Sequence, residues 1–349
     1  PLDNPEKGSP TPVKFGDVAG EGAGETSPNV LMGEGLQRLA RYGNAKSHTL
    51  RLLDTTGDTA AKQAGLRVAD IRRCGDWLLF RHFPSTKQTK LRAANFCCTH
   101  LICGFCAIRR GARMMARYLE RFTQARSKRP DLQPFLVTLT VRNGPDLRER
   151  LDHLDKCLTR LNKRRHRPRC NSVITDIAGA VWSFEVTYSD TRGWHPHVHA
   201  VWLSSEEPDQ FALRREWEEI TGDSFMCDVR PIGAVRRPLD DQQESDVVDP
   251  YAKGFAEVFK YALKAAELPP HVALDAYTVL RGRRLVRSFG VFYGVPEPAN
   301  DELADDIPTE DLPYIDLLWR YAGEGRYEHA KTVDRTSQHR EGRSDDVVL

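Results

Sequence analysis

Three histidines stand at alternate positions of one short segment, at His195, His197 and His199. The apolar residues that follow predict a β-strand, in which successive side chains point to opposite faces of the sheet. His197 and His199 are therefore expected on one face, as two imidazoles preorganised to bind a divalent cation. His195 is a further candidate ligand of the same parity, although Pro196 stands at the strand entrance. The alternative is uncoordinated histidines; we favour metal binding because polar groups on an otherwise apolar strand need partners.

The preceding segment, residues 181–188, also alternates in polarity and is expected to form a hairpin with the histidine strand. Its polar face carries Ser183, Glu185 and Thr187, beside the histidines. Glu185 is the candidate third ligand, because two imidazoles and a carboxylate with open positions suit Mg²⁺ or Mn²⁺ bound to a phosphate oxygen. The alternative is that Glu185 is an exposed strand carboxylate.

Residues 254–268 have the periodicity of an amphipathic helix, and Tyr261 falls on its polar side. A phenol, with a pKa of about 10, is a weak nucleophile unless cations or a metal favour the phenolate. Lys260 and Lys264 supply such cations. Glu257, four residues before the tyrosine, can act as a general base toward water. Taken alone, this pattern favours a routine amphipathic helix with an exposed tyrosine, and the catalytic interpretation depends on the other motifs.

Four of the eight cysteines cluster in the sequence: Cys97, Cys98, Cys103 and Cys106. Thiolates at this spacing are typical of a structural zinc site. Either Cys74 or His100 can complete the tetrahedron, and Cys97 can replace Cys98. The favoured zinc ligands are Cys74, Cys98, Cys103 and Cys106. The alternative is a group of reduced, buried cysteines, and the three isolated ones are expected to be structural: Cys157, Cys170 and Cys227.

Charge is unevenly distributed along the chain, although the net charge is only +2. Residues 107–170 contain 18 Lys and Arg against 6 Asp and Glu, whereas residues 296–349 contain 6 against 14. A basic run can be a solvated helix face, but its position beside the motifs above favours a nucleic-acid partner. The side chains expected to contact DNA are Arg109, Arg110, Arg113, Arg117, Arg142, Lys163, Arg164 and Arg165. Screening of the basic region is one hypothesis for the acidic end.

The length and composition are those of a soluble globular protein with one large or two medium domains: 349 residues, 40% hydrophobic and 29% charged. No apolar run is long enough to span a membrane, and residues 1–26 lack the apolar core of a signal peptide. We therefore expect a cytoplasmic protein with no membrane partner, in which the cysteines do not form a disulfide framework.

Strands separated by helices predict an α+β fold, with an antiparallel sheet flanked by helices. Strands are expected at residues 135–141, 181–188, 197–203, 226–232 and 285–293. Helices are expected at residues 107–126, 147–165, 210–222 and 254–268. The predicted regions are a weakly ordered 1–65 with one short helix at 35–42, a cysteine-rich 66–130 with a small β element at 67–90, a catalytic domain at 131–295, and an acidic tail at 296–349 with one helix at 312–322.

The ordered motifs resemble those of the replication initiators of small rolling-circle plasmids, within the endonuclease superfamily with two histidines around a bulky apolar residue (HUH). The three motifs are FLVTLTV at residues 135–141, HPHVH at 195–199 and EVFKYALK at 257–264. The resemblance extends over residues 74–293 and includes the cysteine-rich segment, in which Cys74-Gly75 also has a counterpart. Each motif alone would be weak, but the ordered trio is specific.

The resemblance implies a ferredoxin-like sheet with a metal site on a central strand. It also implies strand-specific nicking at a plasmid double-strand origin that is single-stranded at the nick site. By motif position, Tyr261 is the nucleophile that leaves a 5′-phosphotyrosyl link and a free 3′-OH primer, and His197 and His199 are metal ligands. Glu257 matches a glutamate thought to activate water at termination. Beyond DNA, a host helicase and polymerase are candidate partners; the origin sequence, the physiological metal and the oligomeric state are not specified by the sequence.

Other functions compete with this one. A relaxase of the same superfamily would carry its tyrosine near the N-terminus, and small transposases are usually shorter and lack the cysteine segment. A metal-dependent hydrolase would need further ligands downstream, where only isolated histidines such as His271 occur. A non-catalytic, zinc-dependent DNA-binding protein would not need Glu257 and Tyr261 on one polar face.

Overall fold

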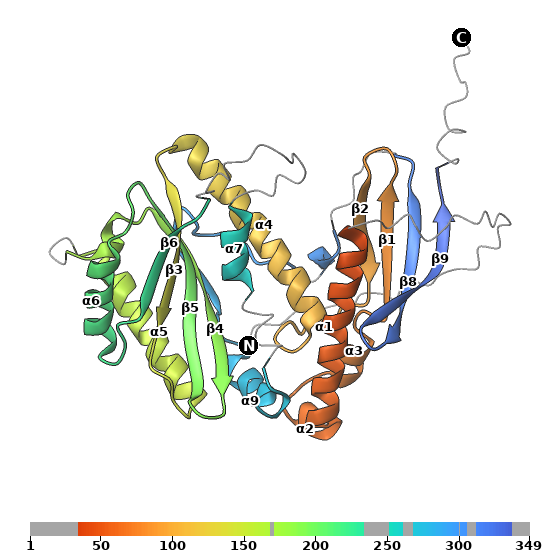
Figure 1. The fold of residues 1–349 in the computed structure, drawn as a ribbon, viewed down its shortest axis with the longest axis horizontal. Helices are drawn as coiled ribbons and strands as arrows, with labels where there is room; N and C mark the ends of the chain where they lie inside the picture. The colour runs from red at the N-terminus through yellow and green to blue at the C-terminus, as the bar shows by residue number, and fades with distance from the viewer. Residues whose placement is uncertain are drawn as a thin grey trace, which may run out of the picture.

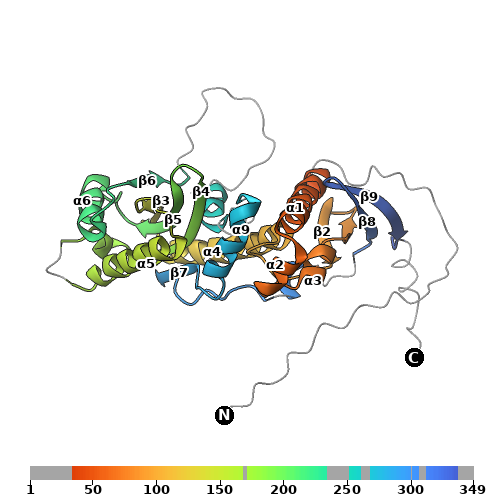
Figure 2. The ribbon, with the colours of Figure 1, turned by 90° about the horizontal axis from the view of Figure 1, so that it is seen from below.

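The computed structural model describes residues 34–167, 171–233, 251–260, 268–299, 301–305 and 312–336. Two antiparallel sheets lie at opposite ends of the molecule, with helices between and around them (Figure 1). The long helix α4 (Gly104–Lys128) runs through the middle of the molecule, from the larger sheet to α1, as Figure 2 also shows. The α+β class and the antiparallel arrangement expected from the sequence are confirmed.

The larger sheet has five strands in the order β6-β3-β5-β4-β7. The strands are β3 (Gln133–Thr140), β4 (Gly179–Ser189), β5 (Gly193–Ser204), β6 (Cys227–Pro231) and β7 (Val286–Gly290). Helices α5 (Leu147–Arg164) and α6 (Gln210–Thr221) connect the first four strands in the pattern βαββαβ. This connectivity, together with the order of those four strands, is that of a ferredoxin-like sheet, with β5 in a central position.

One face of this sheet is apolar and is covered by α5 and α6 (Figure 1). Val137 and Leu139 on β3 lie opposite Ala200 and Val198 on β5, and all four are buried. The apolar residues of α5 recur every three or four positions and face this layer. Its first turn is capped by Asp146, whose carboxylate accepts the Glu149 amide at 3.0 Å. The polar residues of β3 and β5 therefore point to the opposite face.

Helix α7 (Ala252–Phe259) lies on that opposite face and packs against β4 and β5. Helix α4 packs on α7 through aromatic side chains, with the rings of Tyr118 and Phe259 5.1 Å apart. Gly111 allows this approach, because a Cβ at that position would lie 2.8 Å from the carbonyl oxygen of Phe259. The end of α7 is thus held between α4 and the sheet. Helix α9 (Pro270–Leu280) follows further along the chain.

The smaller sheet has the strand order β2-β1-β8-β9. Its strands are β1 (Trp77–Phe83), β2 (Gln88–Ala94), β8 (Ile315–Gly323) and β9 (Arg326–Asp334). The helix expected at 312–322 is wrong, because this segment is β8. Leu317 and Trp319 alternate with more exposed residues and lie opposite Phe80 and Leu78 of β1. A short apolar run of this kind does not distinguish strand from helix until its partner is known.

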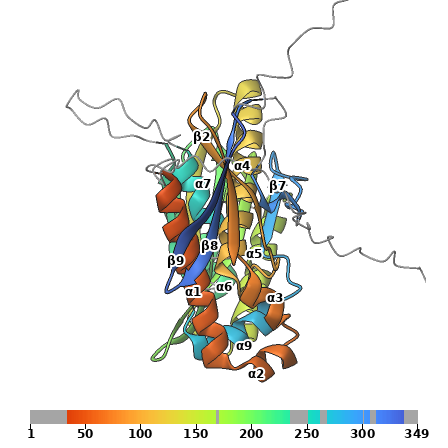
Figure 3. The ribbon, with the colours of Figure 1, turned by 90° about the vertical axis from the view of Figure 1, so that its right-hand side faces the viewer.

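Helix α1 (Glu34–Thr56) lies alongside β9 (Figure 3) and is much longer than the short helix expected at 35–42. It is followed by α2 (Asp58–Gln63) and α3 (Val68–Arg73). The buried ammonium of Lys46 donates to the carbonyls of Arg72 and Cys74, both at 2.8 Å, and to the Asp76 carboxylate. This bonding fixes α1 to the turn that carries Cys74. Within the described residues, no helix combines the length and apolarity needed to cross a membrane.

Candidate active site and metal centres

Glu185, His197 and His199 converge on one face of the larger sheet. Glu185 of β4 lies directly across from His197 of β5 in the strand register. Its carboxylate oxygens lie 3.0 Å from Nε2 of His197 and 3.5 Å from Nε2 of His199. One ligand atom from each side chain falls within 4.8 Å of the other two. Two imidazoles and a carboxylate in this arrangement can bind a divalent metal ion.

The other ring nitrogens of the two histidines are also occupied. Nδ1 of His197 lies 3.2 Å from the carbonyl oxygen of His195, and Nδ1 of His199 lies 3.0 Å from the hydroxyl of Thr138. A carbonyl can only accept, so the contact with His195 requires a proton on Nδ1 of His197. With a metal ion bound, this tautomer would leave the lone pair of Nε2 free to ligate it. Such outer hydrogen bonds orient metal-binding histidines and set their tautomer.

The sequence offered His195 as a further ligand, but the structure does not bring it into the group. Its ring stacks on that of His197, with the centroids 5.1 Å apart. Burial lowers the pKa of His195 below its usual value, and the neighbouring His197 adds to the effect. The hydrogen bond from His195 to the group is made by its backbone carbonyl and not by a ring nitrogen.

The burial of Glu185 has a consequence for the chemistry. Only 2% of its surface is exposed, and it lies between two imidazoles. A buried carboxylate is costly unless it is paired or coordinates a metal. His199 is more exposed than its two partners, so the group is accessible from its side. The arrangement is therefore that of a metal site with an open direction, as catalytic sites have.

Helix α7 contacts the same face beside this group. The hydroxyl of Ser183, which lies across from His199 in the register, donates to the carbonyl of Val258. Near the end of the helix, Lys260 pairs with Glu257 at 2.5 Å, and both side chains are partly exposed. The polar side of α7 expected from the sequence therefore carries this ion pair. The other two residues predicted on this helix, Tyr261 and Lys264, lie outside the described residues.

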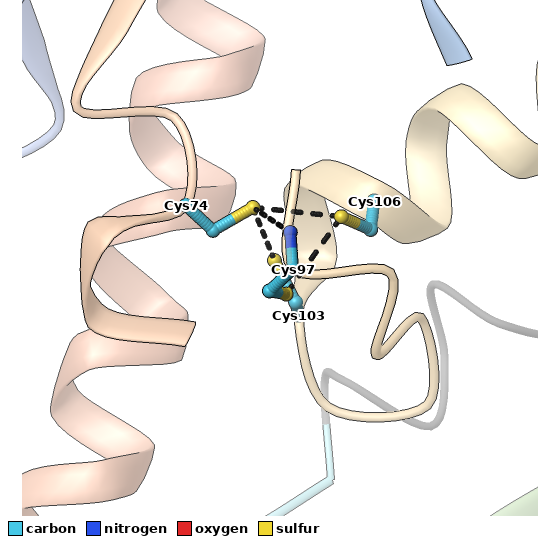
Figure 4. Close-up of side chains that lie close together, drawn as sticks. All are labelled: Cys74, Cys97, Cys103 and Cys106. Carbon is cyan, nitrogen blue, oxygen red and sulfur yellow. Dashed lines mark hydrogen bonds between the residues drawn. The ribbon is translucent and has the colours of Figure 1, made fainter. Parts of the chain in front are cut away.

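Four cysteines form a second group, with their sulfurs directed toward one another (Figure 4). The group consists of Cys74, Cys97, Cys103 and Cys106. Sγ of Cys74 lies 3.5 Å from the sulfurs of Cys103 and Cys106, and the sulfurs of Cys97 and Cys106 are 3.8 Å apart. Four sulfurs at the usual zinc bond length form a tetrahedron with edges of roughly 3.8 Å. The spacing of this buried group therefore fits a tetrahedral zinc ion.

The structure places Cys97 in this group instead of Cys98, which the sequence favoured. Cys98 has a left-handed backbone, with φ of 57°, and its thiol contacts the carbonyl of Phe96. Burial raises its pKa to about 11. His100, the other alternative, is also outside the group, and burial together with Arg110 lowers its pKa to about 4. The turn at Cys98 therefore selects which of two adjacent thiols points inward.

The clustered thiols perturb one another strongly. Hydrogen bonding from Cys103, followed by Cys106 and Cys74, holds the pKa of Cys97 far below its usual range. The pKa of Cys74 is raised, with Cys103 as the largest cause. The amide of Cys97 also donates to the sulfur of Cys74 at 3.4 Å. A cluster that favours thiolate on one sulfur and offers an amide to another is suited to a cation.

The arginines of α4 that were expected to contact DNA face the protein itself. Arg109 is buried and donates to Tyr42, to the carbonyl of Leu303 and to Asp305. It is therefore a structural residue, and its prediction as a DNA contact is corrected. Burial of a guanidinium requires such partners. Two of them, Leu303 and Asp305, belong to the segment that the sequence predicts as an acidic tail. The other three α4 arginines predicted to contact DNA also bond to that segment: Arg110, Arg113 and Arg117.

The remaining basic residues predicted at the DNA interface lie at or near α5. Arg142 and Lys163 are exposed. Arg164 pairs with Glu219 at 2.7 Å and with the buried Glu216, whereas Arg165 stacks on Phe289. Helix α5 covers the face of the sheet opposite the Glu185 group, so Lys163 and Arg164, at the end of this helix, lie on that side.

Sequence reasoning missed the part played by Thr138. It lies on β3 directly across from His199, inside the first motif, and bonds to Nδ1 of that histidine. A polar residue at an alternate position of an otherwise apolar strand is a signal that the sequence does contain. Its partner could be named only once the register of β3 against β5 was known.

The comparisons with known proteins agree with the motifs. A family model described as "Replication protein" matches residues 88–315. A protein named "Protein rep" from Streptococcus pneumoniae serotype 2 (strain D39) is 25% identical over 267 residues, covering 72% of this chain and 79% of its own length. A "Protein rep" from Lactiplantibacillus plantarum is 23% identical over 209 residues, covering 58% of this chain and 62% of its own length. No solved structure matches significantly. The chain thus belongs to the replication protein family, as the plasmid replication initiator that its motifs predicted.

Proposed function

We propose that this protein starts rolling-circle replication by nicking one DNA strand at a plasmid origin, with Tyr261 as the nucleophile. The observation that carries the proposal is the Glu185, His197 and His199 group on the face where α7 lies. Val258, three residues before Tyr261, accepts a hydrogen bond from the residue across from His199. The chain therefore reaches the proposed nucleophile from a point beside the proposed metal site.

The reaction exchanges one phosphate ester for another. The phenol oxygen of Tyr261 attacks the scissile phosphorus and loses its proton, and the bond from phosphorus to the 3′-oxygen breaks. The 3′-oxygen takes up a proton and becomes a primer end, while the 5′-phosphate stays on the tyrosine. Lys260 places a positive charge one residue from the phenol, which favours the phenolate. A host polymerase and helicase would then use the exposed 3′-OH and the displaced strand.

Glu185, His197 and His199 would hold Mg²⁺ or Mn²⁺ through one carboxylate and two Nε2 atoms. When bound, the metal ion supplies Lewis-acid polarisation of the phosphate oxygens. Thr138 and the carbonyl of His195 keep the two imidazoles in the orientation that this requires. Glu257 is the proposed base that activates a water at termination, and in the structure it pairs with Lys260.

The four-cysteine group would hold a structural Zn²⁺. Its sulfur spacing and burial support this assignment, and its members come from the end of α3, the segment after β2 and the start of α4. A zinc ion there would fasten these three segments to one another. Since α4 also packs on α7, the zinc site would support the helix that leads to Tyr261.

The direct test is formation of a covalent adduct. A labelled single-stranded origin oligonucleotide with Mg²⁺ or Mn²⁺ should give a protein–DNA adduct that survives denaturation. Tyr261→Phe should abolish it, whereas Tyr293→Phe, which alters an exposed tyrosine, should keep it. An adduct that persists in Tyr261→Phe would reject the proposed nucleophile. The absence of an adduct for every origin fragment that the protein binds would favour the non-catalytic DNA-binding alternative.

A further inference from the structure

An acidic segment covers the basic face of α4. We call residues 296–299 and 301–305 the acidic strap, and Arg110, Arg113 and Arg117 the arginine row. Each arginine of the row bonds to the strap. Arg110 pairs with Glu297, and Arg113 donates to the carbonyl of Ala304. Arg117 donates to the carbonyl of Pro296 at 3.0 Å and to Glu302 at 2.6 Å.

The two ends of the strap are held very differently. Asp305 is anchored by Arg109, by Arg38 at 2.7 Å and by the amide of Leu91 at 2.7 Å. Although its burial opposes ionisation, Arg109 and these hydrogen bonds lower its pKa to about 2. Glu297 and Glu302 are 54% and 42% exposed, so water and salt weaken their ion pairs. The strap is therefore fixed at Asp305 and weakly held over the arginine row.

The strap offers the arginine row the same chemistry as a nucleic-acid backbone. Guanidinium groups bind carboxylates and phosphates through the same fork of donors, so carboxylates along the strap can substitute for phosphates. The Nε of Arg110 is buried and makes no hydrogen bond to the residues that the structure describes. A cavity lined by Arg110, Glu297, Arg283 and His100 lies at this end of the strap. Glu297 therefore does not engage all the hydrogen-bond donors of the Arg110 guanidinium.

The arginine row also adjoins the proposed active-site helix. Gly111, next to Arg110, packs on the carbonyl of Phe259, two residues before Tyr261. A DNA strand held by the row would be attached to the element that leads to the nucleophile. Binding there would therefore contribute to placing the substrate.

We propose that the arginine row is a DNA-backbone contact surface that the acidic strap occupies when no DNA is bound, and that phosphates displace Glu297 and Glu302 from it. The strap then lowers affinity for DNA of any sequence, so that stable binding requires contacts specific to the origin. The inference rests on the proposed function in one respect: it assumes that the polyanion bound by the arginine row is DNA. It does not depend on the tyrosine chemistry.

The test compares strap variants of the full chain, in the Tyr261→Phe background, for binding to labelled oligonucleotides of arbitrary sequence. Glu297→Gln with Glu302→Gln keeps the side-chain shapes and removes two competing charges. We expect about tenfold tighter binding at low salt, and a salt dependence steeper by roughly two contacts. Single- and double-stranded probes, run separately, show which form the row holds. Because no nicking occurs in this background, failure of the proposed chemistry would leave the result unchanged.

The matched control is Asp131→Asn, which removes the carboxylate of an exposed pair with Arg129 just beyond the end of α4. It should leave affinity within twofold of the parent. Adding Arg110→Gln and Arg117→Gln to the strap variant should cancel its gain. Equal gains in the strap variant and in Asp131→Asn, or no gain in a strap variant that melts like the parent, would overturn the proposal.

Hydrogen exchange provides an independent readout on the unaltered strap. Addition of DNA should increase amide exchange over residues 296–302 and leave the segment around Asp305 protected. A strap that stays protected at saturating DNA would contradict the displacement.

Discussion

The two groups of side chains that could hold metal ions differ in closure. The cysteine group has four ligands of one kind, all buried, and its sulfur spacing matches a complete tetrahedron. The group of Glu185, His197 and His199 has three ligands of two kinds and is accessible beside His199. A closed set can only hold the chain together, whereas an open set leaves positions for a substrate oxygen. The difference predicts that damage to the first group is measured as stability and damage to the second as activity.

The largest effect is expected for His199→Ala. Loss of one of three ligands should lower nicking by about 10³-fold, because a bound metal ion contributes several kcal/mol to the transition state. The melting temperature should change little, because His199 is only partly buried. His195→Ala, on the same strand and with the same parity, is the matched control and should stay within about tenfold of the parent. Equal losses in initial nicking rate for the two variants would mean that the ligand set is misassigned.

The next effect concerns the choice between adjacent cysteines. Cys97→Ser should release the zinc and lower the free energy of unfolding by about 3 kcal/mol or more, since metal binding at a structural site contributes to folding. Cys98→Ser should keep both the metal and the stability, because the Cys98 thiol is directed away from the group. Metal content by mass spectrometry and thermal melts check both variants. Loss of zinc from Cys98→Ser but not from Cys97→Ser would reverse the assignment.

A smaller effect is expected at the outer hydrogen bond of the open group. Thr138→Val keeps the shape of the side chain and removes its bond to Nδ1 of His199. The affinity for Mn²⁺ should fall by about 10- to 100-fold, while saturating metal should restore most of the nicking rate. Thr187→Val, on the neighbouring strand, is the comparison. Unchanged Mn²⁺ affinity in Thr138→Val would contradict the proposed role of Thr138 in orienting His199.

The smallest effect is the pH dependence of stability that comes from His100, in the segment of the cysteine group. The pKa of His100 is about 4 in the folded chain against about 6.5 when unfolded. The unfolded state therefore binds the proton more readily, so stability is full above pH 6.5 and falls as the pH drops toward 4. The full difference between these two pKa values would correspond to about 3 kcal/mol, and the partial exposure of His100 reduces the expected loss to about 1–2 kcal/mol. Denaturant titrations should show a smaller loss in His100→Asn, and the parent loss in His271→Asn, which alters an exposed histidine. An identical pH dependence in His100→Asn would contradict the assignment.

The sequence predicted the open group more completely than the closed one. Strand alternation is a local property, so the parity of His197, His199 and Glu185 could be read directly, and the structure brings these three together. The choice of Cys97 over Cys98 depends on one left-handed residue, which the spacing of cysteines does not reveal. The tertiary structure determines which helices and strands surround each group, and the sequence alone does not predict this.

Long-range pairing explains the other differences. Strand β8 pairs with β1, more than 200 residues earlier in the chain, so its strand character comes from a partner that no local window contains. The arginines of α4 were visible as a basic face. The acidic segment that pairs with them lies about 190 residues later in the chain. Composition alone predicts only an acidic tail there.

The most direct measurement of the central claim is the position of the DNA on the protein after reaction. Trypsin digestion of the adduct, followed by mass spectrometry, should find the nucleotide 5′-phosphate on the peptide of residues 261–264, and its yield should require Mg²⁺ or Mn²⁺ and fall with His199→Ala. A nucleotide attached to any other tyrosine, or an adduct on Tyr261 that forms equally well without the metal and without His199, would contradict the account.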